Sequence, residues 1–263
     1  MFSPYYRWAR TKNPWAHCAL NVALYAPRKH YWAMTERSAR DVSASSNAIA
    51  IGRSAAQWDG SALHLRIEET AAPLPGPIQG EVTVTPETIS DAAFALDDAR
   101  KHWWRPLAPH ARIDVRFAKP ALAWRGAAYC DMNWGVEPLS NAFRAWHWQR
   151  EHTPDGALVH YDIAPRRGAP RLIALRYDAQ GRAQPCAAQD AQALPGTFWG
   201  VSRVARGDAR LVKTLEDTPF YARSALAGAH GDIVHETVSL DRFDQPIVQA
   251  MLPFRMPRLV LGR

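Results

Sequence analysis

The 263-residue chain has only three cysteines, Cys18, Cys130 and Cys186. Their odd number and unpaired spacing argue against a disulfide framework and against a cysteine-based metal site, and suit a reducing compartment. No apolar run approaches the roughly 18 residues of a membrane-spanning helix, and the N-terminal residues lack the apolar core of a signal peptide. We therefore expect neither a membrane-spanning helix nor a signal peptide. Any association with a membrane would be peripheral.

Several catalytic and binding patterns are also missing. The sequence has no Gly-x-Ser-x-Gly elbow, no Walker loop, no His-Glu-x-x-His and no Gly-x-Gly-x-x-Gly opening a helix, and none of its motifs requires a metal. Lysine and arginine number 32 against 25 aspartates and glutamates, a net charge of +7. That excess suits an anionic membrane surface, an acidic partner or a solvated surface. Without a nucleic-acid-binding motif, we expect no nucleic-acid partner.

Alternation of apolar and polar residues is the recurrent positive signal. It occurs at residues 63–67, 82–85 and 113–117, and a period of two is typical of half-buried antiparallel strands. Further candidate strands lie at residues 18–25, 31–35, 47–51, 158–163, 172–177, 198–204, 210–215 and 232–240. Residues 91–102 form the only segment of the first half that we expect to be helical. The sequence predicts an all-β fold of two modules, residues 1–123 and 124–263, each large enough for an antiparallel β-barrel or sandwich.

Residues 127–150 concentrate two carboxylates, a histidine, a tyrosine and three tryptophans. Asp131 is a candidate pocket carboxylate, with an Asx-type turn as the alternative. Trp146 and Trp148 fall on one strand face and His147 on the other, so the two indoles either contact a ligand or pack in the core. Acid chemistry on an apolar substrate is the function this composition favours.

Asp162 is the second notable carboxylate. It follows Tyr161 inside the apolar segment 158–163, where a charged side chain is costly unless it is paired, neutral or catalytic. The alternative is an exposed position paired with Arg166 or Arg167.

Six segments in order resemble the carotenoid 1,2-hydratases, also called hydroxyneurosporene synthases. They are FSPYYRWAR at residues 2–10, HCALNVALY at 17–25, WAMTER at 32–37, YCDMNWGVEPL at 129–139, LEDTPFYARS at 215–224 and PFRMPR at 253–258. The resemblance implies two lipocalin-like β modules packed together and a cofactor-independent hydro-lyase. It also implies hydration of the terminal 1,2 double bond of acyclic carotenoids, such as neurosporene and lycopene, taken from the cytoplasmic side of a bacterial membrane. Within it, Asp162 matches the family's proton donor best.

The chemistry of alkene hydration predicts roles for these residues. Because water is a weak nucleophile, an acid must first protonate the alkene and leave a tertiary cation at C1, and a desolvated carboxyl group such as Asp162 or Asp131 suits this step. Desolvated indole faces stabilise a cation by ~0.5 to 2 kcal/mol each, a role for Trp134, Trp146 and Trp148. His147, Asp131 or Tyr161 would hold the water and take its proton.

Two other functions are compatible with the same residues. A non-catalytic lipocalin-like binder of apolar polyenes would use the tryptophans without needing an acid. A polyene cyclase or isomerase would use the acid but would give a product of unchanged mass.

Overall fold

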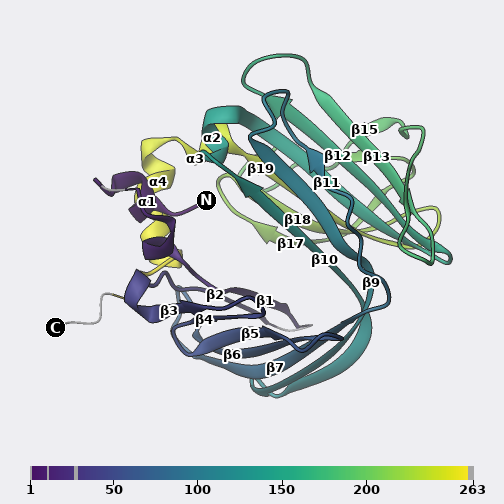
Figure 1. The fold of residues 1–263 in the computed structure, drawn as a ribbon. Coiled ribbons are helices and arrows are strands. Elements are labelled where there is room, and N and C mark those ends of the chain that lie inside the picture. Colours follow the sequence, from purple (N-terminus) through teal and green to yellow (C-terminus); the bar gives the residue numbers. More distant parts are fainter. Residues whose placement is uncertain (1, 11, 27–28, 260–263) are drawn as a thin grey trace. The chain divides into compact units, whose positions relative to one another are not determined.

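The computed structural model describes residues 2–10, 12–26 and 29–259 (Figure 1). Two compact units are assembled from interleaved stretches of chain. The first comprises Met1–Pro86, Ala111–Ala128 and Gln249–Arg263, and the second Glu87–His110 and Tyr129–Val248. A division into modules 1–123 and 124–263 stays a prediction. Strands dominate both units and all pair antiparallel in their sheets, which confirms the all-β prediction.

The first unit is built on one sheet in which neighbouring strands are mostly consecutive in sequence. The sheet order is β10-β9-β7-β6-β5-β4-β3, and β8 pairs with β9. The bounds are β3 Val42–Ala44, β4 Ala48–Ile51, β5 Ser54–Trp58, β6 Leu63–Thr70, β7 Pro77–Pro86, β8 Phe94–Ala95, β9 His102–Lys119 and β10 Leu122–Gly135. Strands β9 and β10 contribute residues to both units, and β8 belongs to the second. Ile67, Val82 and Val84 are buried, as their alternation with polar neighbours predicts.

The first unit also contains a two-stranded sheet and short helices near the chain ends. They are α1 Pro4–Trp8, η1 Pro14–His17, β1 Asn21–Tyr25, β2 His30–Met34 and η2 Ala39–Asp41. The buried Glu36 side chain holds this region together: it accepts hydrogen bonds from Ser3 and Arg258 and lies 2.8 Å from Nδ1 of His17. One carboxylate thus fixes the N-terminal segment and the C-terminal tail to the residues that follow β2.

The second unit is built on a seven-stranded sheet of order β14-β13-β12-β11-β19-β18-β17 (Figure 1). The bounds are β11 Phe143–Thr153, β12 Gly156–Pro165, β13 Arg171–Tyr177, β14 Ala183–Pro185, β17 Arg210–Asp217, β18 Tyr221–Ala227 and β19 Asp232–Ser239. The hairpin of β15 (Ala191–Ala193) and β16 (Val204–Arg206) packs with this sheet, because Leu194, Ala205 and Ala209 form a buried cluster with Leu226 and Ile233. The helices are α2 Leu139–Ala142, α3 Leu240–Phe243 and α4 Pro246–Arg255, which continues into the first unit.

Two local predictions were wrong. Residues 91–102 are not helical, because Phe94 packs against Trp104 of β9 and the Leu96 amide donates to the His102 carbonyl, so the segment folds back as a hairpin. The turn is stabilised by Asp97, whose carboxylate accepts from the Lys101 amide. Residues 198–203 form a loop rather than a strand.

Candidate active site

The central sheet of the second unit presents two chemically different faces. Directly opposed residues on neighbouring strands share a face, and the register pairs Trp148 with both Tyr161 and Glu236. We call the face that carries Trp146, Trp148, Tyr161 and Glu236 the aromatic face. On the opposite side, which we call the histidine face, lie His147, His160, Asp162 and His235.

Asp131 reaches the aromatic face from β10. Nε1 of the fully buried Trp104 donates a hydrogen bond to Oδ2 of Asp131 at 2.7 Å, and the Tyr129 hydroxyl donates to the same oxygen at 3.2 Å. The Trp104 ring meets Tyr161 edge to face, with 5.4 Å between centroids. The Tyr129 ring lies 5.4 Å from that of Trp148. Aromatic side chains from four strands therefore surround a single carboxyl group.

This environment favours the neutral form of Asp131. Burial raises the pKa of the Asp131 carboxyl, the hydrogen bonds from Trp104 and Tyr129 oppose that rise, and the negative charge of Glu236 adds to it. Burial also raises the pKa of Tyr161 and, well above its usual range, that of Tyr129. The aromatic face thus places a carboxyl group whose pKa is raised by burial next to neutral phenols.

His102 supports this arrangement from the start of β9. Its Nδ1 lies 2.5 Å from Oδ2 of Asp97, and its Nε2 lies 3.1 Å from the carbonyl oxygen of Glu137. A Cβ on Gly135 would lie 2.5 Å from Cδ2 of His102, so only glycine leaves room for the ring at the end of β10. His102 is the first residue of β9, the strand that carries Trp104. Its contact with the Glu137 carbonyl therefore connects the start of β9 to the segment that follows Asp131.

Asp162 lies on the histidine face, in an ion pair with Arg206 rather than with Arg166 or Arg167. Nε of Arg206 donates to Oδ2 of Asp162 at 3.1 Å, and Nη2 donates to Oδ1. The Arg206 amide also donates to the Gln149 side chain at 2.7 Å. The two predicted acids, Asp131 and Asp162, thus point to opposite faces of the sheet, and Asp162 anchors β16.

The other predicted residues divide between the two faces in the same way. Trp146 meets Tyr161 edge to face with 6.4 Å between centroids, so it joins Trp148 near Asp131. Nδ1 of His147 instead lies 2.8 Å from the Thr237 hydroxyl, and burial lowers the pKa of this histidine. Trp134 lies on the side of β10 away from Asp131 and stacks on Trp103 with 6.2 Å between centroids.

Comparison with known proteins identifies the family of this fold and site. The sequence profile of the carotenoid hydratase CrtC family matches residues 1–261. The chain belongs to this family. It is 45% identical to an acyclic carotenoid 1,2-hydratase of Thiocapsa roseopersicina over 98% of this chain and 67% of that protein. It is 35% identical to one of Cereibacter sphaeroides over 98% of this chain and 95% of that protein.

The fold also has a counterpart among solved structures. The crystal structure of an AttH protein from Nitrosomonas europaea superposes with a TM-score of 0.56 at 15% identity, covering 83% of this chain and 80% of that one. This similarity concerns the fold alone. The family membership shows that the chain is a hydro-lyase of the carotenoid hydratase family.

The sequence analysis of this carotenoid hydratase assigned no role to three residues that the structure places beside or behind Asp131: His102, Trp104 and Tyr129. Tyr129 could have been found, because residues two apart in a strand share a face. Trp104 could not, since 27 positions separate it from its hydrogen-bond acceptor, and no local pattern links them.

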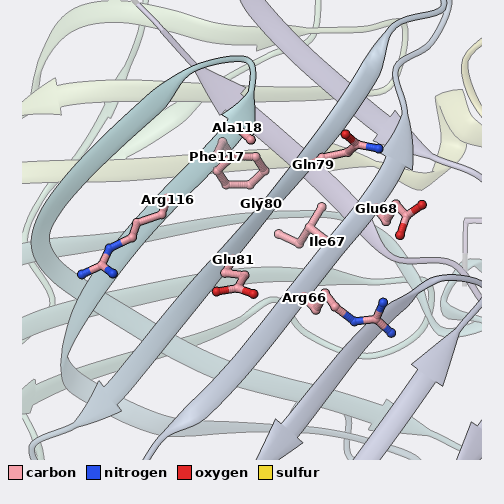
Figure 2. A pocket seen from close by; sticks show the side chains of 9 residues that line it. All are labelled: Arg66, Ile67, Glu68, Gln79, Gly80, Glu81, Arg116, Phe117 and Ala118. Carbon is pink, nitrogen blue, oxygen red and sulfur yellow. The ribbon is translucent and has the colours of Figure 1, made fainter.

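A shallow pocket of about 520 Å³ lies elsewhere, in the first unit of this family member (Figure 2). Arg66, Glu81 and Arg116 form a row across three of its strands, and Glu68 and Gln79 also line it. Ile67, Phe117 and Ala118 contribute apolar surface, but the four charged side chains do not suit an apolar polyene, so we assign no substrate to this pocket. Within residues 2–10, 12–26 and 29–259, no group of three or more histidines, cysteines or acids is placed to hold a metal.

Two buried histidines of the histidine face lead us to expect that the protein loses stability in acid. Burial lowers the pKa of His160 and of His235 to about 4, whereas an unfolded histidine titrates near 6.5. The unfolded chain therefore binds protons first, so stability is highest above about pH 6.5 and falls as the pH approaches 4. We expect the free energy of unfolding to drop by on the order of 3 kcal/mol per histidine, as measured by urea titration at several pH values.

A matched pair of variants checks the source of this effect. His235→Gln should reduce the pH dependence, while His30→Gln, at an exposed position of β2, should leave it unchanged. Equal unfolding free energies at pH 7 and pH 4.5 in the unmodified chain would contradict the expectation.

Proposed function

We propose that this chain hydrates the terminal 1,2 double bond of acyclic carotenoids, such as neurosporene and lycopene, to 1-hydroxy-1,2-dihydro products without a cofactor. The observation that carries the proposal is Asp131, a carboxyl group whose pKa is raised by burial among Trp104, Tyr129 and Tyr161. Membership of the carotenoid hydratase family supports the reaction class. Among the two aspartates considered from the sequence, the ion pair of Asp162 with Arg206 favours Asp131 as the acid.

The first step is proton transfer from Asp131 to C2 of the alkene. The carboxyl O–H bond breaks, a C2–H bond forms, and the positive charge develops at C1, where two methyl groups and the chain stabilise a tertiary cation. The hydrogen bonds from Trp104 and Tyr129 favour the carboxylate that remains. Burial favours the protonated form of Asp131 before the substrate arrives. The two hydrogen-bond donors stabilise the carboxylate that forms when the proton has left.

The cation at C1 then requires stabilisation without a covalent trap. Trp146, Trp148 and Tyr161 present aromatic rings on the same face as Asp131, and each desolvated ring contributes ~0.5 to 2 kcal/mol. Water adds at C1 because the cation is there, so the tertiary alcohol follows from cation stability.

Incubation of the purified chain with lycopene or neurosporene in detergent tests the proposal. We expect a product heavier than the substrate by one water. A bound but unchanged polyene would favour a non-catalytic binder, and a new product of unchanged mass would favour a cyclase or isomerase. Either result, repeated in several detergents and lipids, would contradict hydration.

We further propose that the chain takes its substrate from an anionic membrane surface by peripheral docking. Residues 1–35 contain no aspartate or glutamate, and Arg7, Arg10 and Lys12 are exposed near Trp8 and Trp15, which are 52% and 53% exposed. Basic residues with tryptophans are typical of segments that bind at a lipid headgroup layer. In the described part of the chain, the helices are too short or too polar to cross a membrane.

The docking proposal predicts a loss of vesicle binding. Replacing Trp8 and Trp15 together with serine should weaken co-sedimentation with phosphatidylglycerol vesicles roughly tenfold, because two interfacial indoles are removed. Trp124→Ser is the control, since Trp124 is similarly exposed at 45% but lies on β10 of the same unit. Unchanged binding of the double variant, or equal binding to neutral phosphatidylcholine vesicles, would contradict docking to an anionic surface.

A further inference from the structure

Glu236 is a second carboxyl group on the aromatic face. It lies on β19 opposite Trp148 of β11 and opposite Arg223 of β18. Nη2 of Arg223 donates to Oε1 of Glu236 at 2.5 Å, and the Glu236 side chain is 24% exposed. Glu236 is therefore an ion-paired, partly exposed carboxylate. It lies beside Trp148, one of the aromatic residues proposed to stabilise the cation.

The two carboxyl groups of this face have opposite environments. Asp131 accepts hydrogen bonds from two neutral donors, the Trp104 indole and the Tyr129 phenol, whereas Glu236 is paired with a guanidinium group. They lie near enough that the Glu236 charge raises the pKa of both Asp131 and Tyr161. A buried carboxyl group between neutral donors and a carboxylate paired with arginine on one face suit the separate roles of acid and base.

We propose that Glu236 is the catalytic base that takes the proton of the water as it adds to C1, with Arg223 as its positioning residue. The assignment rests on the proposed hydration. A lone pair of the water forms the C1–O bond, one O–H bond breaks, and its proton passes to the Glu236 carboxylate. Asp131 has meanwhile become a carboxylate by protonating C2. The cycle closes when Glu236 releases its proton and Asp131 gains one through solvent, so the only net reactant besides the alkene is water.

Reaction in D₂O separates this base from the acid. If Glu236 acts only after the cation has formed, Glu236→Gln still allows Asp131 to transfer a deuteron to C2 and to take a proton back. We expect hydration to fall at least about 100-fold, while the recovered alkene gains deuterium at a rate within about threefold of wild-type hydration. Mass spectrometry of product and recovered substrate measures both rates.

The same mass-spectrometric measurement applies to a control variant and shows which outcomes would contradict the role of Glu236. Glu68→Gln removes a carboxylate of similar side-chain exposure, 32%, from an ion pair with Arg53 in the first unit, and should behave as wild type. Hydration by Glu236→Gln within a few-fold of wild type, or an equal fall of hydration and exchange, would overturn the assignment. A wild-type protein that neither hydrates nor exchanges would instead refute the proposed function.

A conservative variant covers the case in which Glu236→Gln does not fold. Glu236→Asp keeps a carboxylate for Arg223 but withdraws it by one methylene from the water. We expect its ratio of hydration to deuterium exchange to be at least about tenfold below that of wild type. An unchanged ratio would overturn the role of Glu236 as base.

Discussion

Asp131→Asn is expected to abolish hydration, with kcat reduced about 1,000-fold or more, while the protein stays folded. An amide cannot deliver a proton to an alkene, but its oxygen can still accept from Trp104 and Tyr129, which now donate at 2.7 and 3.2 Å. The measurement is the rate of hydrated product from lycopene at saturating substrate, together with the thermal unfolding midpoint. The same variant should also stop deuterium incorporation into recovered substrate, because no cation forms.

The pH dependence has a defined sign. Asp131 must be protonated to act, and its pKa is raised mainly by burial. We therefore expect kcat to fall as the pH rises through the pKa of Asp131. Asp114→Asn is the control: it removes an aspartate of β9 that is paired with Arg116 and Arg125 and lies in the first unit. Activity of Asp131→Asn near the wild-type level would remove this residue from the mechanism.

The strand pattern was predictable from the sequence, and so was part of the aromatic face. Alternation at residues 63–67 and 82–85 predicted β6 and β7 because each strand has one buried side. The spacing of Trp146 and Trp148 also placed both indoles on one face. The helix expected at 91–102 was wrong because a contact with Trp104, outside the segment, selects a hairpin.

The sequence alone could not show which face of β12 carries the chemistry. Tyr161 and Asp162 are adjacent, so they point to opposite sides, and the choice depends on what covers each side. Arg206 of β16 covers Asp162, while Trp104 of β9 covers Tyr161. Both contacts join residues more than 40 positions apart, which is why local patterns favoured two aspartates without separating their environments.

Asp162→Asn is the second decisive substitution, and we expect it to change stability rather than chemistry. The variant leaves the Arg206 guanidinium partly buried without its anionic partner, which should lower the free energy of unfolding by roughly 2 kcal/mol. The value of kcat should change by less than about threefold, since Asp162 and Asp131 lie on opposite faces of the sheet. Urea denaturation and the lycopene assay measure the two effects.

Two comparisons make this expectation specific. Adding Arg206→Gln to Asp162→Asn should cost less than the sum of the single substitutions, because the two side chains share one interaction. Asp178→Asn removes the partner of Arg182 in a more exposed pair and should lower the free energy of unfolding less than Asp162→Asn does. If Asp162→Asn instead abolishes turnover at unchanged stability, the proton donor is the aspartate that the family resemblance favours, and the aromatic face around Asp131 binds the polyene without protonating it.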